Sequence, residues 1–553
     1  MAASTRITEE LINEYFSKGY WKNETTSGVW DHHARTIPDR EALSDSKYRL
    51  TWAQVKDMSD RLAVALLGMG LKRDDPVFLL LPNCVESYVT RIALEKSGLF
   101  CITALMTVRE YEIEHVLKTY DVVAVFVPTK FRNFDYFEAV NHMRAGLPRL
   151  KFIFVMDDSV PAGAVSLTEM MKADLPPRFT DHYFEKTRYR PTDAFTAGLT
   201  SGTTGMPKVA EYPICSIMHM GEGYHLMPKL RPDDVVLNVL SAVGGLGRPF
   251  CYVAREGARM VVQEVWDAQQ ALSIMEREKV TVLLSAPAQL SLLIQQSNLG
   301  DFNLEPLRAV CCSTSVLGKE AIETAEAKLG ANVLNAYGVS DGGIISETTI
   351  DDDRETRSCT VGKPFEGTEI RIVDDQGNEV PAGEEGELWF RGPGTSSGFY
   401  RDPDLTVKTW GALGKEGWFR TGDLVRIDRR GNLIMTGRKK DVIIRGGQNI
   451  YPAEIENLLS LHKAVRQAAI VPMPDPIMGE KACAYVSLND REEFSFEIMI
   501  NHLKNWNVAP YKLPERLEIM NELPARGHKV SKVELKEDII RKLQLEAKGP
   551  LNV

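Results

Sequence analysis

Short apolar runs that alternate with amphipathic helical patterns dominate the first two-thirds of the chain, and this alternation most constrains the fold. The runs 76–81 and 122–127 have strand length, whereas the pattern over 59–70 has helical spacing. Further strand-like runs lie at 259–265, 280–286 and 308–314. Apolar strands joined by helices form parallel sheets that the helices cover. The sequence therefore predicts layered α/β subdomains.

The pattern changes at about residue 365. Apolar and polar residues then alternate with the period of strands, interrupted by Gln376-Gly377 and Ala382-Gly383, pairs typical of hairpin turns. This pattern predicts a β-rich unit over about 365–436.

A smaller α/β pattern follows residue 440. A helix is expected to begin at Pro452 and to place Ile455, Leu458, Leu459 and His462 on one stripe. Strand-like segments come after it, so this region has the elements of a small α+β domain.

A chain of 553 residues is too long for one hydrophobic core. We therefore expect a large N-terminal domain over 1–439, which includes the β-rich unit, and a small mobile C-terminal domain over 440–553. No low-complexity linker separates them, so a short hinge should join them.

Composition narrows the class of protein. The formal net charge of -10 argues against a protein that coats nucleic acid, but not against one that binds a nucleotide. The eight cysteines are scattered without a CxxC pair, which argues against a disulfide framework or structural zinc. Thr8 followed by two glutamates predicts a capped helix rather than a signal peptide, and no apolar run has membrane-spanning length. These features favour a cytoplasmic protein.

The loop 199–208 has the residues of a phosphate-binding loop. It lies between two strand-like segments, and its glycines let backbone N–H groups converge on an anion. It differs from a P-loop because no Lys-Ser/Thr pair and no helix follow its second glycine. A surface turn rich in Ser, Thr and Gly is the alternative. The residues expected to contact phosphate are Thr200, Ser201, Gly202, Thr203, Thr204, Gly205 and Lys208.

Four further segments make the chain resemble a known family. They are the segments 335–343 (NAYGVSDGG), 418–424 (WFRTGDL), 437–456 (GRKKDVIIRGGQNIYPAEIE) and 523–532 (LPARGHKVSK). Together with TSGTTGMPK they resemble, in order and spacing, the motifs of the adenylate-forming superfamily of acyl- and aryl-CoA ligases, stand-alone adenylation enzymes and firefly-type luciferases.

The resemblance implies a two-step reaction. The carboxylate of an acid attacks the α-phosphorus of ATP, which gives an acyl-adenylate and pyrophosphate. A thiol, that of CoA, then displaces AMP. Charge builds up on phosphate oxygens in the first step, so preorganised donors and Mg2+ are needed.

The resemblance also implies nucleotide-binding roles. Asp423 would accept hydrogen bonds from the ribose, Arg438 would donate to ribose or phosphate, and Tyr337 would stack beside adenine, although each could instead be a turn, surface or core residue. Asp341 stands where the family usually has Glu and would hold Mg2+. Ser313 to Ser315 replace the usual Gly-Gly-Ala. The remaining nucleotide-binding residues implied are Ser313, Thr314, Ser315, Asn335, Ala336, Gly338 and Ser340.

Less specific roles concern the acid, the thiol and the hinge. Lys440 would be the hinge residue. Gly446 and Gly447 would leave room for the pantetheine arm of CoA, or form a simple turn. Gly244 and Gly245 stand where relatives often carry a His or aromatic gate, and with Gly342 and Gly343 they would line the acid pocket.

Lys529 and Lys532 compete for the role of the family's catalytic lysine. The pattern Lys-Val-x-Lys after Leu-Pro favours Lys529, which with Asp341 and Thr200 completes the expected catalytic set. Lys532 would lie on the first turn of a terminal helix running through Val533, Leu535 and Ile539. The role of His528, which stands where most relatives have Gly, stays open.

The leading hypothesis is an AMP-forming acid–thiol ligase that joins a small or aromatic acid to CoA. One alternative is a stand-alone adenylation enzyme that loads a carrier protein in trans, and another is a non-catalytic nucleotide-binding relative. Aromatic, short branched and hydroxy acids stay open as substrates, as does a homodimer.

Overall fold

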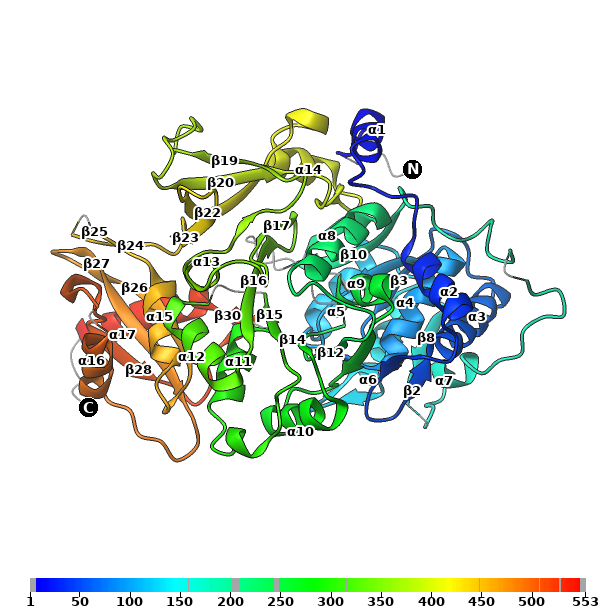
Figure 1. Cartoon of the computed structure of the whole chain (residues 1–553), viewed down its shortest axis with the longest axis horizontal. Coiled ribbons are helices and arrows are strands. Elements are labelled where there is room, and N and C mark those ends of the chain that lie inside the picture. Colours follow the sequence, from blue (N-terminus) through cyan, green and yellow to red (C-terminus); the bar gives the residue numbers. More distant parts are fainter. Residues whose placement is uncertain are drawn as a thin grey trace.

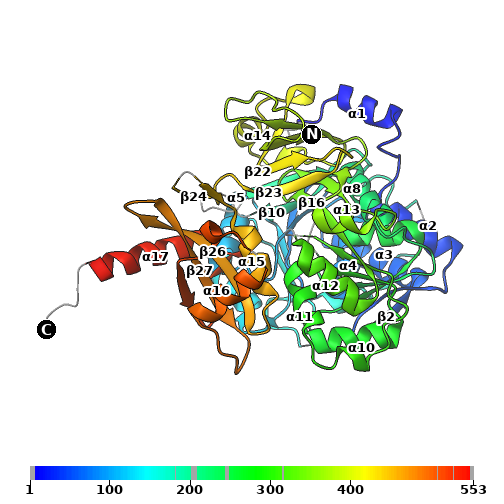
Figure 2. The ribbon, with the colours of Figure 1, turned by 60° about the vertical axis from the view of Figure 1, so that its left-hand side comes forward.

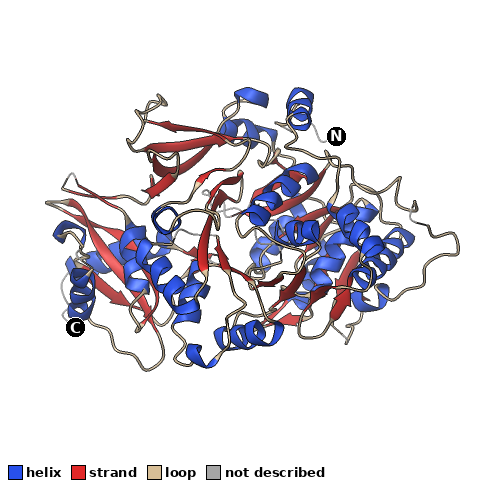
Figure 3. Cartoon of the chain, viewed as in Figure 1, coloured by secondary structure: helices blue, strands red, loops and turns tan. Residues whose placement is uncertain are grey.

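The computed structural model describes residues 6–157, 159–180, 182–200, 208–242, 248–313, 317–446, 448–506, 508–526 and 529–547. Two large sheets with their helices form one side of the molecule, and a smaller α/β unit and a β-rich unit lie beside them (Figures 1 and 3). This arrangement confirms the predicted α/β class with a large N-terminal and a small C-terminal domain.

In the described part of the chain, the first large sheet has eight strands in the order β21-β11-β10-β4-β3-β5-β8-β9. The segment from β10 to β9 is parallel, whereas β11 pairs antiparallel with both β10 and β21. The predicted strands at 76–81 and 122–127 are thus confirmed. The bounds are β3 (Pro76–Leu79), β4 (Phe100–Thr103), β5 (Ala124–Val127), β8 (Phe152–Val155), β9 (Val165–Ser166), β10 (Ala194–Thr200), β11 (Lys208–Pro213) and β21 (Gly398–Phe399).

The second large sheet has nine strands within the described residues, in the order β18-β17-β16-β15-β14-β12-β13-β1-β2. Its centre is parallel, and β16 turns back antiparallel into β17. The bounds are β1 (Glu41–Ser44), β2 (Arg49–Thr51), β12 (Val235–Asn238), β13 (Arg259–Val262), β14 (Val282–Ser285), β15 (Ala309–Cys312), β16 (Asn332–Val339), β17 (Gly343–Glu347) and β18 (Lys363–Pro364).

Helices cover both sheets. α4 is buried along its whole length, and the main core joins residues of both sheets to residues of α3, α4, α8 and α9. The predicted Thr8 cap is confirmed, because its side chain accepts from the Leu11 N–H at the start of α1. The bounds are α1 (Glu9–Ser17), α2 (Thr26–Thr36), α3 (Trp52–Gly68), α4 (Val85–Ser97), α5 (Glu110–Thr119), α6 (Tyr136–Met143), α7 (Leu167–Met170), α8 (Ile214–Leu226), α9 (Arg248–Glu256), α10 (Ala268–Glu278), α11 (Pro287–Ile294), α12 (Lys319–Leu329), α13 (Arg354–Cys359) and α14 (Pro403–Trp410).

The β-rich unit is an antiparallel sheet in the order β19-β20-β22-β23. Gly377 and Gly383, with φ of +84° and +92°, lie in the connection between its first two strands, where the turn pairs were expected. The strands are β19 (Glu369–Val373), β20 (Gly386–Arg391), β22 (Phe419–Ile427) and β23 (Leu433–Arg438).

The C-terminal unit has a sheet in the order β25-β24-β27-β26, with β28 beside β27. α17 extends away from the body of the molecule (Figure 2). Among the described residues, none of the helices is both long and apolar enough to cross a membrane. The bounds are β24 (Ile443–Arg445), β25 (Gln448–Ile450), α15 (Pro452–Ser460), β26 (Val465–Asp475), β27 (Gly479–Leu488), α16 (Phe496–Asn505), β28 (Arg516–Ile519) and α17 (Lys532–Ala547).

One detail of this unit differs from the sequence predictions, and one is confirmed. α15 begins at Pro452 as expected but ends at Ser460, so His462 lies beyond the helix and accepts from the Ala464 N–H. α17 runs through Val533, Leu535 and Ile539 as predicted; Leu535 and Ile539 are buried, and Val533 is 60% exposed.

The C-terminal unit is docked on the N-terminal domain by polar contacts. Tyr451 donates to a Glu385 oxygen at 2.7 Å, and the Gln295 side chain donates to the Ser460 carbonyl at 3.1 Å. The proposed boundary at 439/440 falls between β23, in the β-rich sheet, and β24, in the C-terminal sheet.

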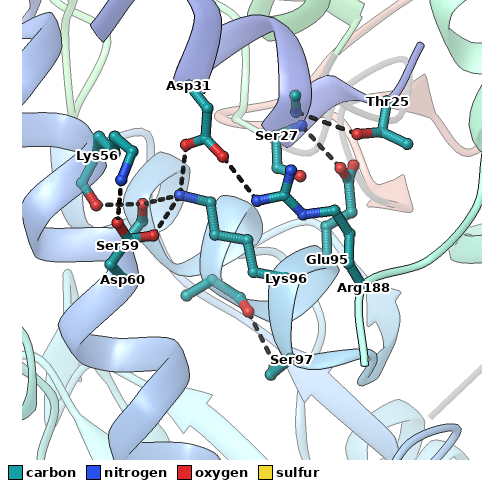
Figure 4. A network of polar contacts seen from close by, with 12 residues as sticks. Thr25, Ser27, Asp31, Lys56, Ser59, Asp60, Glu95, Lys96, Ser97 and Arg188 are labelled. Carbon is teal, nitrogen blue, oxygen red and sulfur yellow. Dashed lines mark hydrogen bonds and ion pairs between the residues drawn. The ribbon is translucent and has the colours of Figure 1, made fainter. Parts of the chain in front are cut away.

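A buried ion cluster ties α2, α3 and α4 together (Figure 4). Lys96, with no exposed side-chain surface, lies 2.7 Å from Asp31 and 2.6 Å from Asp60, and Arg188 lies 2.6 Å from Asp31. Burial alone would raise the pKa of Asp31, but the charges of Lys96 and Arg188 outweigh it and lower that pKa. The cluster therefore joins three helices that pack in the main core.

Candidate active site

Asp423 is the centre of a buried polar group at the junction of three strands. It pairs with Arg438 across β22 and β23, and Arg438 Nε lies 2.7 Å from Asp423 Oδ1. The Tyr337 hydroxyl, on β16, donates to Oδ2 at 2.6 Å. Burial and then the charge of Asp423 raise the pKa of Tyr337, so the phenol stays protonated and donates. The three predicted nucleotide residues therefore meet at one point.

The second oxygen of Asp423 keeps acceptor capacity. Although Oδ1 contacts Arg438, the geometry is not that of a hydrogen bond, and Oδ1 has no aligned donor among the described residues. A buried carboxylate oxygen without a donor is costly. This orphaned acceptor fits a ligand that brings hydroxyl donors, as the ribose of ATP would.

Lys529 lies at the edge of the same group. It begins β30 (Lys529–Val530), which pairs with β29 (Ala525–Arg526) in a small hairpin. The surface of Lys529 is exposed, but the surrounding protein displaces part of the water around its ammonium group. This loss of hydration is the main effect that lowers the pKa of Lys529. The charge of Arg438 lowers the pKa further, whereas Asp423 and Asp341 raise it. The hairpin thus brings the C-terminal lysine within electrostatic range of the candidate site.

Lys532, the competing lysine, is used elsewhere. Its ammonium group lies 2.6 Å from Glu456, at the start of α17 and within the C-terminal unit. The charges of Arg438 and Asp423 act on Lys529, whereas Lys532 is paired within the C-terminal unit.

Asp341 lies in the turn between β16 and β17, where two hydroxyl groups hold the backbone. Tyr212 donates to the Ser340 carbonyl at 2.7 Å, and Ser396 donates to the Asp341 carbonyl at 2.6 Å. The carboxylate is partly exposed, and the described residues hold no cluster of three His, Cys, Asp or Glu side chains for a metal. One carboxylate suits Mg2+, which in such sites is shared with phosphates and water.

The phosphate loop itself falls largely outside the described residues. Thr200 ends β10 and Lys208 begins β11, so the loop joins two antiparallel strands as expected. The Lys208 ammonium group lies 5.8 Å from the centroid of the Phe399 ring. Outside the described residues lie Ser201, Gly202, Thr203, Thr204, Gly205, Gly244, Gly245, Thr314, Ser315, Gly447 and His528.

The adenine segment is only partly as expected. Ser313 is buried at the end of β15, and Ala336 and Gly338 flank Tyr337 on β16. The Asn335 side chain donates to the Arg357 carbonyl at 3.1 Å and so joins β16 to α13. Asn335 therefore contributes to the site by holding its strand.

Close packing or a positive φ explains why glycine occupies the described positions predicted at the acid and CoA sites. A side chain at Gly342 would meet Val339 and Phe390, and one at Gly343, where φ is +129°, would meet the Gly394 carbonyl. Gly446, with φ of +54°, donates to the Met478 carbonyl in a tight turn. A turn of this kind is compatible with both roles that the sequence left open for Gly446. Lys440 is exposed between β23 and β24.

Sequence analysis missed the residues that support the Asp341 turn. Tyr212, Thr395 and Ser396 contact it from segments distant in the chain, and no local pattern marks them. Glu211 was also missed. It is buried on β11 beside β21, and loss of hydration raises its pKa to about 7, against a lowering effect of the Ser397 hydroxyl.

Comparison with known proteins gives matches over nearly the whole chain. Residues 30–400 match the AMP-binding enzyme family and residues 454–529 its C-terminal domain. The medium-chain fatty-acid–CoA ligase of Escherichia coli is 29% identical over 98% of this chain and 95% of its own length. The salicylyl-CoA synthase / salicylate adenylyltransferase of a Streptomyces species is 30% identical over 96% of this chain and 97% of its own.

A solved structure shares the fold. The anthranilate CoA ligase AuaEII in complex with anthranoyl-AMP superposes with a TM-score of 0.84 and 21% identity over 94% of this chain and 98% of that one. The paired domain matches and the shared motifs have one explanation: the chain belongs to the AMP-binding enzymes, the adenylate-forming superfamily.

Proposed function

We propose that this protein is an ATP-dependent carboxylic acid:CoA ligase that acts on a small or aromatic acid through an acyl-adenylate. The observation that carries the proposal is the buried group of Asp423, Arg438 and Tyr337 in the N-terminal domain, whose charges act on Lys529 of the C-terminal domain. Adenylation needs a cation, a carboxylate that can still accept hydrogen bonds and a carboxylate that can hold a metal ion.

In the first half-reaction, an acid oxygen bonds to the α-phosphorus of ATP while the bond to the pyrophosphate oxygen breaks. Asp423 would accept from the ribose hydroxyls, and Arg438 would orient Asp423 and donate to the nucleotide. Lys529 would bridge the acid carboxylate and the α-phosphate. Mg2+ held by Asp341 would neutralise charge on the phosphate oxygens.

In the second half-reaction, a thiolate attacks the acyl carbon and AMP leaves. We propose that the domain over 440–553 turns about Lys440 between the two steps, because one site must serve two geometries. The small turn at Gly446 would then face the incoming thiol.

The acceptor has a second candidate. A relative with both activities in its name, the salicylyl-CoA synthase / salicylate adenylyltransferase, supports CoA transfer and adenylation alike. A carrier protein in trans is therefore the alternative acceptor. A non-catalytic nucleotide-binding protein is a less favoured alternative, because the chain carries Asp423, Arg438 and Lys529 at the motif positions of the family.

The test is ATP–pyrophosphate exchange against a panel of salicylate, other aromatic acids, medium-chain fatty acids, short branched acids and hydroxy acids. The active acids are then incubated with ATP and CoA, and AMP release is followed. An acid that gives ATP–pyrophosphate exchange and also CoA-dependent release of AMP supports the ligase. Exchange without CoA-dependent release supports the carrier-protein alternative, and no exchange with any acid contradicts adenylation.

A further inference from the structure

Arg6 is a buried arginine in a segment that precedes the AMP-binding family match at residue 30. It is 1% exposed, and its guanidinium carbon lies 3.9 Å from the centroid of the Trp410 ring. Its Nε donates to the Ser396 carbonyl at 3.2 Å, and its Nη2 donates to the Thr395 hydroxyl. The N-terminal segment is thus inserted against residues nearly 400 positions away.

The charge of Arg6 is not balanced by an ion pair. Among the described residues, no carboxylate lies within ion-pair distance of its guanidinium, and loss of hydration lowers its pKa to about 10. A buried cation without a carboxylate is costly unless its donors are used. Two of them are used on one short stretch of chain, Thr395–Ser396, and the Tyr15 hydroxyl of α1 interacts with the guanidinium as well. The stretch Thr395–Ser396 is therefore where Arg6 contacts a segment distant in the chain.

That stretch supports the turn that carries Asp341. The Ser396 hydroxyl donates to the Asp341 carbonyl at 2.6 Å, and the Ser396 N–H donates to the Gly342 carbonyl at 2.9 Å. Thr395 forms a bridge with Gly343. Thr395 and Ser396 are 1% and 0% exposed, so water cannot replace Arg6 as the partner of their oxygen atoms.

We propose that Arg6 is a positioning residue for adenylation. It fixes Thr395 and Ser396, and these residues fix the backbone on either side of Asp341. The inference rests on the proposed function for the reaction it serves, but the contacts themselves are independent of the substrate. A shift of the Asp341 turn would misplace its carboxylate relative to the phosphates, whereas the second half-reaction has no such requirement.

The test uses the full-length chain with the variants Arg6→Met, Arg6→Lys and Ser396→Ala. Trp21→Phe is the matched control, because Trp21 anchors the same N-terminal segment by donating to the Pro393 carbonyl at 3.0 Å and not to Thr395 or Ser396. Four quantities are compared: hydrogen–deuterium exchange of the peptide 338–343, calorimetric Kd for magnesium-ATP, kcat and KM of ATP–pyrophosphate exchange, and thioester formation from preformed acyl-adenylate.

For Arg6→Met we expect faster deuterium uptake in 338–343, a kcat for exchange lower by ~10-fold and a KM for the acid within ~2-fold of wild type. Thioester formation from preformed adenylate should stay within ~2-fold, and Arg6→Lys should restore part of kcat. Ser396→Ala removes the hydroxyl that donates to the Asp341 carbonyl and leaves the charge of the protein unchanged. It should show the same pattern as Arg6→Met, so the proposal can still be tested if Arg6→Met does not fold.

Two results would overturn the proposal. One is deuterium uptake in 338–343 that equals that of Trp21→Phe for both Arg6→Met and Ser396→Ala. The other is an equal loss in both half-reactions, which indicates general loosening. If wild type shows no exchange with any acid, the proposed function fails, and deuterium uptake with the magnesium-ATP Kd still decides whether Arg6 positions the turn.

Discussion

The ammonium group of Lys532 lies 2.6 Å from Glu456, and this ion pair joins the first turn of α17 to α15. The same glutamate accepts from the Ile470 N–H at 2.6 Å. Lys532 is therefore part of the internal structure of the C-terminal unit, while Lys529, three residues earlier, is the lysine on which the charges of Arg438, Asp423 and Asp341 act.

This separation predicts opposite effects of two alanine substitutions. Lys529→Ala should lower the rate of ATP–pyrophosphate exchange by roughly 10²–10³, because one preorganised cation is lost from the developing charge. Thioester formation from preformed acyl-adenylate should be spared. Lys532→Ala should leave exchange within ~3-fold and lower the free energy of unfolding by about 1 kcal/mol or less. A larger loss of exchange in Lys532→Ala would assign the role to Lys532.

The group around Asp423 predicts a graded loss of nucleotide affinity. Asp423→Asn removes the charge that faces Arg438 and replaces one acceptor oxygen with a donor, so we expect Kd for magnesium-ATP to rise by ~10-fold or more. Tyr337→Phe removes only the hydroxyl that donates to Asp423, and it should weaken the binding free energy of magnesium-ATP by about 1 kcal/mol. Isothermal calorimetry measures both. Equal ATP affinity in wild type and Asp423→Asn would exclude Asp423 from the nucleotide site.

Glu211 predicts a pH dependence of stability. Burial raises the pKa of its carboxyl from an ordinary 4.5 to about 7 in the folded protein, so the folded state keeps the proton to higher pH than the unfolded state does. Its contribution to stability is therefore complete below pH 4.5 and falls as the pH rises to about 7.

Glu211→Gln mimics the protonated form at every pH. It should raise the free energy of unfolding at pH 8 by on the order of 2–3 kcal/mol and change it little at pH 4.5. Denaturant titrations at the two pH values measure the difference, with Glu493→Gln at an exposed position as the control. A variant that is no more stable than wild type at pH 8 would show that Glu211 is ionised in the fold without cost.

The cluster around Lys96 predicts a large loss of stability on truncation. Lys96→Met leaves Asp31 and Asp60 buried with fewer cations, which should cost about 3–5 kcal/mol. The exposed pair of Lys172 and Glu169 is the matched comparison, and Lys172→Met should cost about 0.5 kcal/mol or less. Thermal unfolding of both variants tests this, and similar melting temperatures for the two would contradict the assignment.

Local patterns in the sequence were sufficient to predict most of the fold. Runs such as 76–81 specify buried strands because every side chain is apolar, and Thr8 and Pro452 mark helix starts through their own chemistry. His462 was misplaced because the stripe of apolar residues continues in sequence after the helix has ended at Ser460.

The site residues that lie in sequence motifs could be predicted, whereas those that depend on tertiary packing could not. Asp423, Arg438 and Tyr337 lie in three motifs that the fold brings together. The Asn335 side chain donates to the Arg357 carbonyl, and Phe390 and Gly394 leave no room for side chains at Gly342 and Gly343. These contacts involve residues about 20 to 50 positions away, so no local pattern could predict them. Arg6 has no motif at all, because its partners lie at the other end of the N-terminal domain.

The position of Arg6 has a practical consequence for anyone who shortens or tags this protein. Trimming the chain to residue 30, where the family match starts, would remove both Arg6 and Trp21 and so expose the apolar surfaces of Trp410 and Cys215 that they and α1 cover. A bulky fusion placed directly against Ile7 would act on the same surfaces. If a protein prepared in either way is inactive, the cause is the lost packing of the N-terminal segment, and the result says nothing about the catalytic role of the motifs.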